Sequence, residues 1–405
     1  MRIDFHGSPE PTLGVEWEFA LVDKKSRDLS NTASELFAAA KPRLDNPARL
    51  HKELLRNTVE VVTGVNHTVG EAVAELRHTL ETVVPVADEL GVDLYGGGTH
   101  PFASWTRQQL TEGHRYEELI NRTQWWGRQM LIWGVHVHVG LPDQDRVMPV
   151  LSSLLNQYPH LLALSASSPI WAGMDTGYAS NRALMFQQLP TAGLPFQFER
   201  WEQLEGYVAD MMHTGVIDQF DEIRWDVRPS PRFGTLEMRI CDGATNQHEL
   251  MALAAVMHCL VDHFSTMLDE GRELPVMPPW FVQENKWRSA RYGMDAIIIL
   301  DKEGDEELVT DAARRLVREL EPAAERLGCT TELDGVHTIL ERGASYQRQR
   351  AAARLGCAEE LGGVSTILER GASYQRQRAV ARQAGGELDA VVASLVAEMR
   401  AGKPL

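Results

Sequence analysis

The sequence predicts an α+β fold built around an antiparallel sheet that has one concave polar face. Strand-like and helix-like segments are interspersed, without the regular strand-helix-strand rhythm of a doubly wound sheet. Several strand-like segments alternate between apolar and charged residues with period 2. Long amphipathic or apolar helical segments are available to cover the apolar face of such a sheet. We therefore expect helices on the other face and a helical C-terminal region that begins near Glu306.

Composition limits the class of protein. The chain has 405 residues, 43% of them hydrophobic, enough for one large domain, which we divide into a core over 1–300 and a helical region of the same domain over 301–405. With a net charge of -17 and no dense basic run, nucleic acid and anionic membranes are poor partners. The first residues lack a signal-peptide pattern, so we expect a cytoplasmic protein. The four cysteines are widely spaced, which favours free thiols.

The segments follow one another in a recognisable order. Two strands are predicted first, then an amphipathic helix that ends at Gly91, then a short strand leading into a glycine-rich loop. One continuous helix is expected before the strand 134–140, and a helical pair broken near Pro159 after it. A later strand should place Cys241 on the same side as its charged residues, and a largely apolar helix follows. The corresponding segments are "TLGVEWEFALVD", "LLRNTVEVVTG", "VGEAVAELRHTLETVVPVADELG", "DLYGGGTHPF", "YEELINRTQWWGRQM", "GVHVHVG", "VMPVLSSLLNQYPHLLALSAS", "RFGTLEMRICDGATN" and "HELMALAAVMHCLVDHFSTML".

Four of the predicted strands carry ionisable groups on the side opposite their apolar residues. Any one of these groups alone is explained by a solvated strand face or a structural histidine. If the strands lie in one sheet, however, period 2 places all of these side chains together on the face that opposes the core. The residues are Glu16, Glu18, Glu60, His136, His138, Glu237 and Arg239.

Such a face predicts a site for divalent cations. Closely packed carboxylates repel one another unless cations lie among them, and oxygen ligands with few imidazoles suit Mg²⁺ or Mn²⁺ better than zinc. Removing one charge, for example by Glu237→Gln, is expected to relieve repulsion in the metal-free protein. Several cations on a concave face suggest a nucleoside triphosphate, and the sequence contains neither a P-loop nor a dinucleotide-binding glycine motif. The sheet itself is therefore the candidate site.

A series of motifs in this order resembles the carboxylate-amine ligases of the glutamate-cysteine ligase type 2 family, in the glutamine synthetase-like superfamily. The likeness runs from about residue 12 to residue 285 and continues more weakly to "GASYQRQ". It implies the superfamily's catalytic fold. The motifs are "GVEWEF", "HKELLRNTVEVVTG", "GGGTHPF", "GVHVHVG", "YASNRA" and "DVRPSPRFGTLEMRICDGATN".

The resemblance implies roles for individual residues. His138 would contact ATP phosphate, and Arg239 would contact the acyl substrate or its phosphorylated form. Arg228 and Arg182 would add electrostatic stabilisation, although each could equally be an ordinary salt-bridged arginine. The metal ligands would be Glu16, Glu18, Glu53, Glu60, His136 and Glu237.

The implied reaction uses ATP and Mg²⁺ or Mn²⁺ to join the γ-carboxylate of glutamate to an amine, most simply cysteine, through an acyl phosphate. The partners would be these small molecules, and a homo-oligomer is left open. A ligase with another acceptor, a metal-dependent amide hydrolase and a non-catalytic ATP-binding protein remain alternatives. The hydrolase is disfavoured because glutamates outnumber histidines in the predicted site.

The C-terminal region contains a tandem duplication with a period of 28 residues. "GVHTILERGASYQRQRA" from Gly335 recurs as "GVSTILERGASYQRQRA" from Gly363, so the units cover about 327–354 and 355–382. Two units are too few for a solenoid. We expect each unit to form two short helices around a Gly-Ala-Ser break, with one unit docked so that its arginines lie near the mouth of the site.

Overall fold

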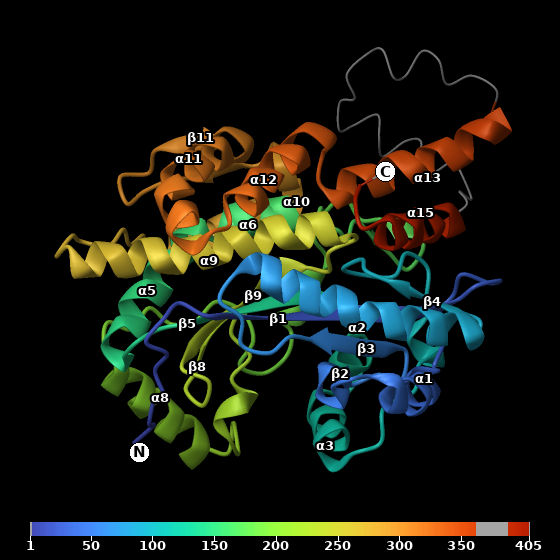
Figure 1. Cartoon of the computed structure of the whole chain (residues 1–405), viewed down its shortest axis with the longest axis horizontal. Helices are drawn as coiled ribbons and strands as arrows, with labels where there is room; N and C mark the ends of the chain where they lie inside the picture. The colour runs from blue at the N-terminus through green and yellow to red at the C-terminus, as the bar shows by residue number, and fades with distance from the viewer. Residues whose placement is uncertain (1, 362–387, 405) are drawn as a thin grey trace.

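The computed structural model describes residues 2–361 and 388–404, and its centre is one antiparallel sheet of seven strands. The strand order is β2-β3-β1-β5-β9-β8, and β4 pairs with the far end of β1 (Figure 1). The predicted α+β class is confirmed. The strands are β1 (Leu13–Asp23), β2 (Leu50–Lys52), β3 (Thr58–Val62), β4 (Val92–Tyr95), β5 (Gly134–Gly140), β8 (Val227–Ser230) and β9 (Thr235–Asp242).

Helices cover one face of this sheet. The long helix α9 crosses it, α2 lies beside α9, and a further layer packs outside α9 (Figure 1). Most of α9 is apolar and buried, because it has the sheet on one side and helices on the other. The helices of this side are α2 (Val69–Glu89), α5 (Val147–Leu154), α6 (Tyr158–Ser165), α9 (Gln247–Asp269), α10 (Pro279–Tyr292), α11 (Val309–Leu327), α12 (Thr330–Arg342), α13 (Ser345–Leu361) and α15 (Leu388–Ala401).

The apolar residues of the central strands supply the sheet's half of the core. Val15, Trp17 and Phe19 of β1 are almost completely buried, as are the valines of β5. They belong to one hydrophobic cluster that also contains residues of α2, α9, α11 and α12. Because side chains alternate across a strand, this packing directs the residues between them to the opposite face.

Shorter elements border that opposite face. In Figure 1, α3 and α8 lie below the sheet, and the described chain also contains two small hairpins. The elements on this side are α1 (Ala33–Ala40), α3 (His114–Thr123), α4 (Trp125–Arg128), α7 (Arg182–Phe186) and α8 (Trp201–His213). Of the hairpins, β10 (Ile297–Ile299) and β11 (Glu306–Leu308) contact α10 and α11, and β7 (Met174–Asp175), which pairs with β6 (Ile170–Trp171), is joined to α13 by an ion pair.

Two local expectations are wrong. The predicted helix before β5 is divided into α3 and α4 because Gln124 has a positive φ of 48°, which no helix interior accommodates. Cys241 does not share the polar face, because the β5–β9 register shifts between Val135 and Val137. Beyond this bulge the alternation of β9 changes sides, and the Cys241 thiol lies 3.9 Å from the backbone oxygen of Leu161 in α6.

The first repeat unit forms the expected pair of helices. α12 ends before Gly343, whose φ is 81°, and α13 begins at Ser345. Arg348 pairs with Glu249 and Glu398, while Arg350 pairs with Asp175. Neither arginine lines the pocket described below, so the expected position near its mouth is wrong for this unit. Residues 362–387, which hold most of the second unit, lie outside the described residues.

Among the described helices, α9 alone has the length and hydropathy of a membrane span. Of its most apolar window, 67% is buried inside the structure. That degree of burial is typical of a central core helix, which passes the same test of length and composition.

Candidate active site

The register of the sheet brings the predicted polar residues into direct cross-strand contact. Glu18 lies opposite Glu60 on β3, and Glu16 lies opposite His136 on β5. Farther along the sheet, His138 is opposite Glu237 on β9, which in turn is opposite Arg228 on β8. Residues that are directly opposite have Cβ atoms about 4.5–5.5 Å apart, so one polar surface results.

Glu16 lies between the two histidines of β5. Its carboxylate oxygens are 2.9 Å from His136 Nδ1 and 3.2 Å from His138 Nε2. Burial favours a neutral carboxyl, but these two imidazoles outweigh it and hold the pKa of Glu16 well below its usual range. The acidic group is therefore ionised and can serve as a ligand.

The two histidines have different electrostatic environments. Burial, reinforced by Arg239, lowers the pKa of His136, which favours the neutral imidazole. For His138 burial acts in the same direction, but Glu237 and Glu16 outweigh it and raise the pKa, which favours the cation. Two similar residues in one strand are thus suited to different partners.

Glu18, Glu53 and Glu60 create an excess of negative charge beside Glu16. Burial, together with the charges of Glu18 and Glu16, raises the pKa of Glu53 to about 8. Burial and the charge of Glu53 raise the pKa of Glu60 well above its usual range. These shifts indicate that the chain's own cations do not neutralise the cluster.

Glu237 differs from the other carboxylates because two arginines pair with it. Arg228 Nε donates to it at 2.5 Å, and Arg239 forms a second, short contact. Burial alone would raise its pKa, but these guanidinium groups lower it strongly. The expectation that Glu237→Gln relieves repulsion is therefore wrong, because the change would leave two facing cations without their shared partner.

Arg182 is not an ordinary salt-bridged residue in the described structure. Its guanidinium donates to the backbone oxygen of Arg239 at 3.1 Å and approaches His136 Nε2 at 3.4 Å, while its buried Nε has no hydrogen-bond partner. A Cβ at Gly134 would lie 2.1 Å from this guanidinium, so the first glycine of "GVHVHVG" is what permits the contact.

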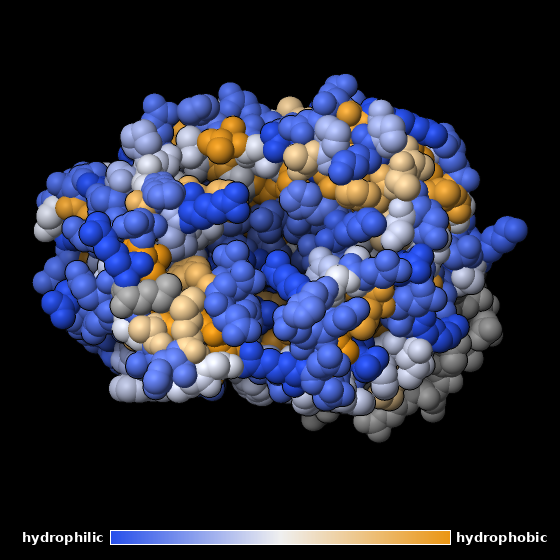
Figure 2. All heavy atoms as spheres, turned by 90° about the horizontal axis from the view of Figure 1, so that it is seen from below, coloured by the Kyte–Doolittle hydropathy of each residue, from blue (hydrophilic) through white to orange (hydrophobic). Residues whose placement is uncertain are grey.

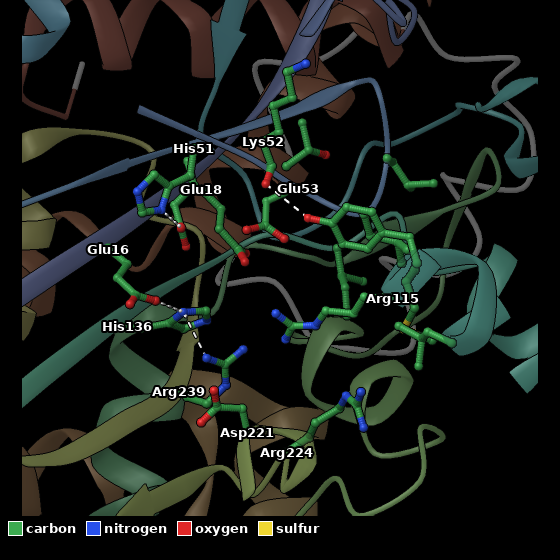
Figure 3. Close-up of a pocket in the computed structure, with 18 of the residues that line it drawn as sticks. Glu16, Glu18, His51, Lys52, Glu53, Arg115, His136, Asp221, Arg224 and Arg239 are labelled. Carbon is green, nitrogen blue, oxygen red and sulfur yellow. Dashed lines mark hydrogen bonds and ion pairs between the residues drawn. The ribbon is translucent and has the colours of Figure 1, made fainter. Parts of the chain in front are cut away.

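Most of these groups line a cavity of about 760 Å³ on the polar face of the sheet, whereas His138 and Glu237 lie outside its lining. Figure 2 shows a hollow with hydrophilic surroundings on the side of the molecule opposite the helical layer. In Figure 3 the acidic side chains of the sheet and several arginines point into the same space.

The cavity also contains residues that the sequence did not reveal. Arg115 and Tyr116 come from α3, and Arg224 comes from the segment before β8. These positions lie in helices and loops without a periodic pattern that singles them out. Further unforeseen lining residues are Lys41, His51, Lys52 and Asp221.

The arrangement of ligand atoms fits divalent cations. One group consists of Glu16, Glu60 and His136, and the other of Glu16, His138 and Glu237; within each group the ligand atoms lie within 4.8 Å of one another. Carboxylate oxygens with one imidazole suit hard cations, and burial beside other carboxylates raises the pKa values of Glu53 and Glu60, an effect that bound cations would oppose.

The glycine-rich loop has a structural role. A Cβ at Gly98 would lie 2.9 Å from the Asp242 carboxylate, whose oxygens accept hydrogen bonds from the Ser168 and Ser180 hydroxyls. The glycines permit close packing against the end of β9, and none of them lines the cavity.

Comparison with known proteins agrees with this geometry. The model of the family described as glutamate-cysteine ligase family 2 matches residues 12–353. The chain is 66% identical over 402 residues to "Putative glutamate--cysteine ligase 2-3" of Nocardioides sp., covering 99% of this chain and 100% of that protein. It is 61% identical over 348 residues to "Putative glutamate--cysteine ligase 2" of Mycobacterium tuberculosis, covering 86% and 92%. That relative is therefore shorter than this chain by about one repeat unit.

Solved structures share the fold. Glutamate–cysteine ligase from Francisella tularensis, in complex with AMP, superposes with a TM-score of 0.61 at 14% identity, covering 98% of this chain and 94% of that chain. A bifunctional glutathione synthetase from Pasteurella multocida gives 0.59 at 14% identity, covering 93% and 52%. The family match over most of the sequence, with two relatives above 60% identity, shows that the chain belongs to the glutamate-cysteine ligase family 2.

Proposed function

We propose that this protein is an ATP-dependent, ADP-forming ligase that joins the γ-carboxylate of glutamate to an amine, with cysteine as the preferred acceptor. The observation that carries the proposal is the cluster of glutamates on the sheet, whose negative charge the described chain leaves unneutralised. The family and the printed names of the relatives support the ligase class.

The acidic side chains and His136 would hold Mg²⁺ or Mn²⁺, with Glu16 shared between the two ligand groups. When bound, the cations would supply positive charge to the phosphates of ATP. His138, whose environment favours the imidazolium form, is suited to donate to a phosphate oxygen.

Three arginines would stabilise the anionic centre. In the first step a glutamate carboxylate oxygen attacks the γ-phosphorus of ATP, which gives an acyl phosphate and ADP. In the second the amine attacks the acyl carbon, releases phosphate and loses a proton. Arg239, Arg228 and Arg182 line the space in which this negative charge accumulates, so electrostatic stabilisation can serve without a nucleophilic side chain.

The test is ADP release by the purified protein with ATP, Mg²⁺, glutamate and a panel of amino acids and amines. We expect ADP only when both glutamate and an amine are present, and loss of the signal in excess EDTA. Full turnover in EDTA, or formation of AMP and pyrophosphate, would contradict the proposal. If an amine other than cysteine gives the highest kcat/KM, the chemistry stands with a different acceptor.

A further inference from the structure

The cavity has two walls of opposite charge. The sheet wall carries Glu16, Glu18, Glu53 and Glu60 beside the arginines already described, whereas α3 and the segment before β8 contribute Arg115 and Arg224 to the other side. Figure 3 shows the guanidinium of Arg115 pointing into the cavity, on the same side as Arg224. The acidic wall can therefore hold cations, and the side that carries Arg115 and Arg224 can hold an anion.

Arg115 and Arg224 have no carboxylate partner within residues 2–361 and 388–404. The Arg224 guanidinium donates to the backbone oxygen of Glu222 at 2.9 Å. Burial lowers the pKa of Arg224 to about 10; the charge of Glu222 partly offsets this effect, and the charges of Arg115 and Arg228 add to it. By contrast, Arg228 has a partner in Glu237. Arg115 and Arg224 thus present guanidinium groups that form no ion pair within the described residues, although the charge of Glu222 acts on Arg224.

An apolar surface lines the cavity together with these walls. Met130, Phe186 and Leu189 form a small hydrophobic cluster, with Leu54 and Ile132 packed against it, and all five line the cavity. Methylene groups gain free energy when they leave water for such a surface. The lining therefore offers an acidic wall for cations, an apolar surface, and a cationic wall for an anion.

We propose that Arg115 and Arg224 bind the carboxylate of the acyl substrate that does not react. The site would then select dicarboxylic amino acids, with the reacting carboxylate at the acidic wall and the aliphatic chain on the Met130–Phe186–Leu189 cluster. This inference rests on the proposed function. It assigns the substrate specificity of the proposed ligase to α3 and to the loop that holds Arg224.

The variant Arg115→Gln tests the assignment, because Arg115 is exposed and its replacement should leave the fold intact. We expect KM for glutamate to rise about tenfold or more with little change in kcat, since a charge-assisted hydrogen bond of about 1.5–3 kcal/mol is lost equally from the ground and transition states. Turnover of 4-aminobutanoate, which lacks the second carboxylate, should be as slow in the variant as in the parent. The ratio of the two kcat/KM values should therefore fall about tenfold.

Arg122→Gln is the matched control on the same helix. Arg122 does not line the cavity, and its nearest acidic partner is Glu222 at 3.9 Å, so KM should stay at the parent value. Arg224→Lys, which retains the charge but not the planar fork, should raise KM less than Arg224→Gln. Equal losses for glutamate and 4-aminobutanoate, or a rise confined to KM for ATP, would overturn the assignment.

Calorimetric binding of glutarate without ATP separates this inference from the proposed function. If the parent releases no ADP with any acid, the proposed function fails, and Arg115-dependent binding of glutarate still supports the subsite. If turnover occurs as proposed but glutarate binds the parent and Arg115→Gln equally, the subsite is wrong and the function stands.

Discussion

Two buried clusters of charged residues in this molecule differ in how their charges are balanced. On the sheet, Glu53 and Glu60 are surrounded by further carboxylates that raise their pKa values. In the helical layer, Arg348 lies between Glu249 and Glu398, with N–O distances of 2.6 and 2.9 Å. In the first cluster the charge of Arg239 does not outweigh the effects of burial and the neighbouring carboxylates, whereas the second has an arginine between its two carboxylates.

This difference in charge balance distinguishes a ligand site from a structural contact between helices. We call the contact of Arg348 with Glu249 and Glu398 the structural joint. Arg348 connects α13 to α9 and α15, and the Thr245 hydroxyl donates to Glu398 at 2.8 Å, so each carboxylate of this cluster has a partner within the chain. An uncompensated buried carboxylate costs free energy, and a fold retains several only where something else neutralises them. The imbalance of charge, rather than burial, identifies the functional cluster.

The largest expected effect comes from changing the sheet face that carries the site. His136→Ala and Glu237→Gln should each reduce ADP release by at least about a hundredfold, because each removes a candidate ligand or its charge. The far-ultraviolet circular dichroism of His136→Ala should match that of the parent, since the residue lies on the side away from the core. Near-parent activity with tightly bound metal would contradict the assignment of this face.

Val137→Asp, one residue along the same strand, is the opposing control. Val137 is fully buried on the packed face, so an unpaired carboxylate there should unfold the protein. Circular dichroism and the soluble yield report the result. A folded Val137→Asp protein would mean that the two faces of β5 are not as different as described.

Next in size is the effect of removing the cation from the structural joint. Arg348→Met would leave Glu249 and Glu398 facing each other without a partner, at a cost of about 3–5 kcal/mol in the free energy of unfolding. Denaturant titration measures the loss, and adding Glu398→Gln should recover part of it. The kcat of the folded fraction should be unchanged, because Arg348 does not line the cavity.

A smaller effect concerns the pH dependence of the sheet cluster. The pKa of Glu53 is raised from 4.5 to about 8, so the unfolded chain releases this proton at lower pH than the folded protein does. The resulting stability is complete below about pH 4.5 and is lost as the pH rises through 8. Metal-free protein should therefore lose stability across this interval, and Mg²⁺ should compensate.

The measurement is the thermal midpoint in EDTA and in Mg²⁺ between pH 5 and 8.5. We expect the stabilisation by Mg²⁺ to increase with pH by a few degrees, and Glu53→Gln to reduce that increase. A stabilisation by Mg²⁺ that does not depend on pH would show that these carboxylates do not respond to the cation.

The sequence predicted the sheet cluster well because period 2 is a short-range property of each strand. Glu16, His136 and Glu237 could be assigned to one face before their strands were paired. The period-2 rule predicted the wrong side for Cys241. At the bulge, β9 has one residue more than β5, which reverses the alternation of the β9 side chains. Arg115 and Arg224 could not be predicted, since only the tertiary fold brings α3 and the loop before β8 to the same cavity.

The smallest effect on chemistry is expected from the repeat. Excising Leu327 to Arg354 leaves the unit 355–382 directly after Arg326, with an unbroken reading frame and one copy of the motif. Every buried residue of the first unit within 327–353 has an identical residue 28 positions later. The differing positions are exposed or half-exposed, namely Thr330, Thr331, Asp334, His337 and Ala352.

The remaining copy can therefore supply the same contacts, including an arginine for Glu249 and Glu398. The excised protein should fold, keep its requirement for ATP and Mg²⁺, and change in stability by about one or two kcal/mol, because loop-closure entropy depends weakly on length. Thermal midpoint, mass in solution and ADP release, compared with the parent, test this expectation. Loss of folding would show that both units are integral to the core, whereas a changed amine preference at unaltered stability would show that the duplication reshapes the acceptor site.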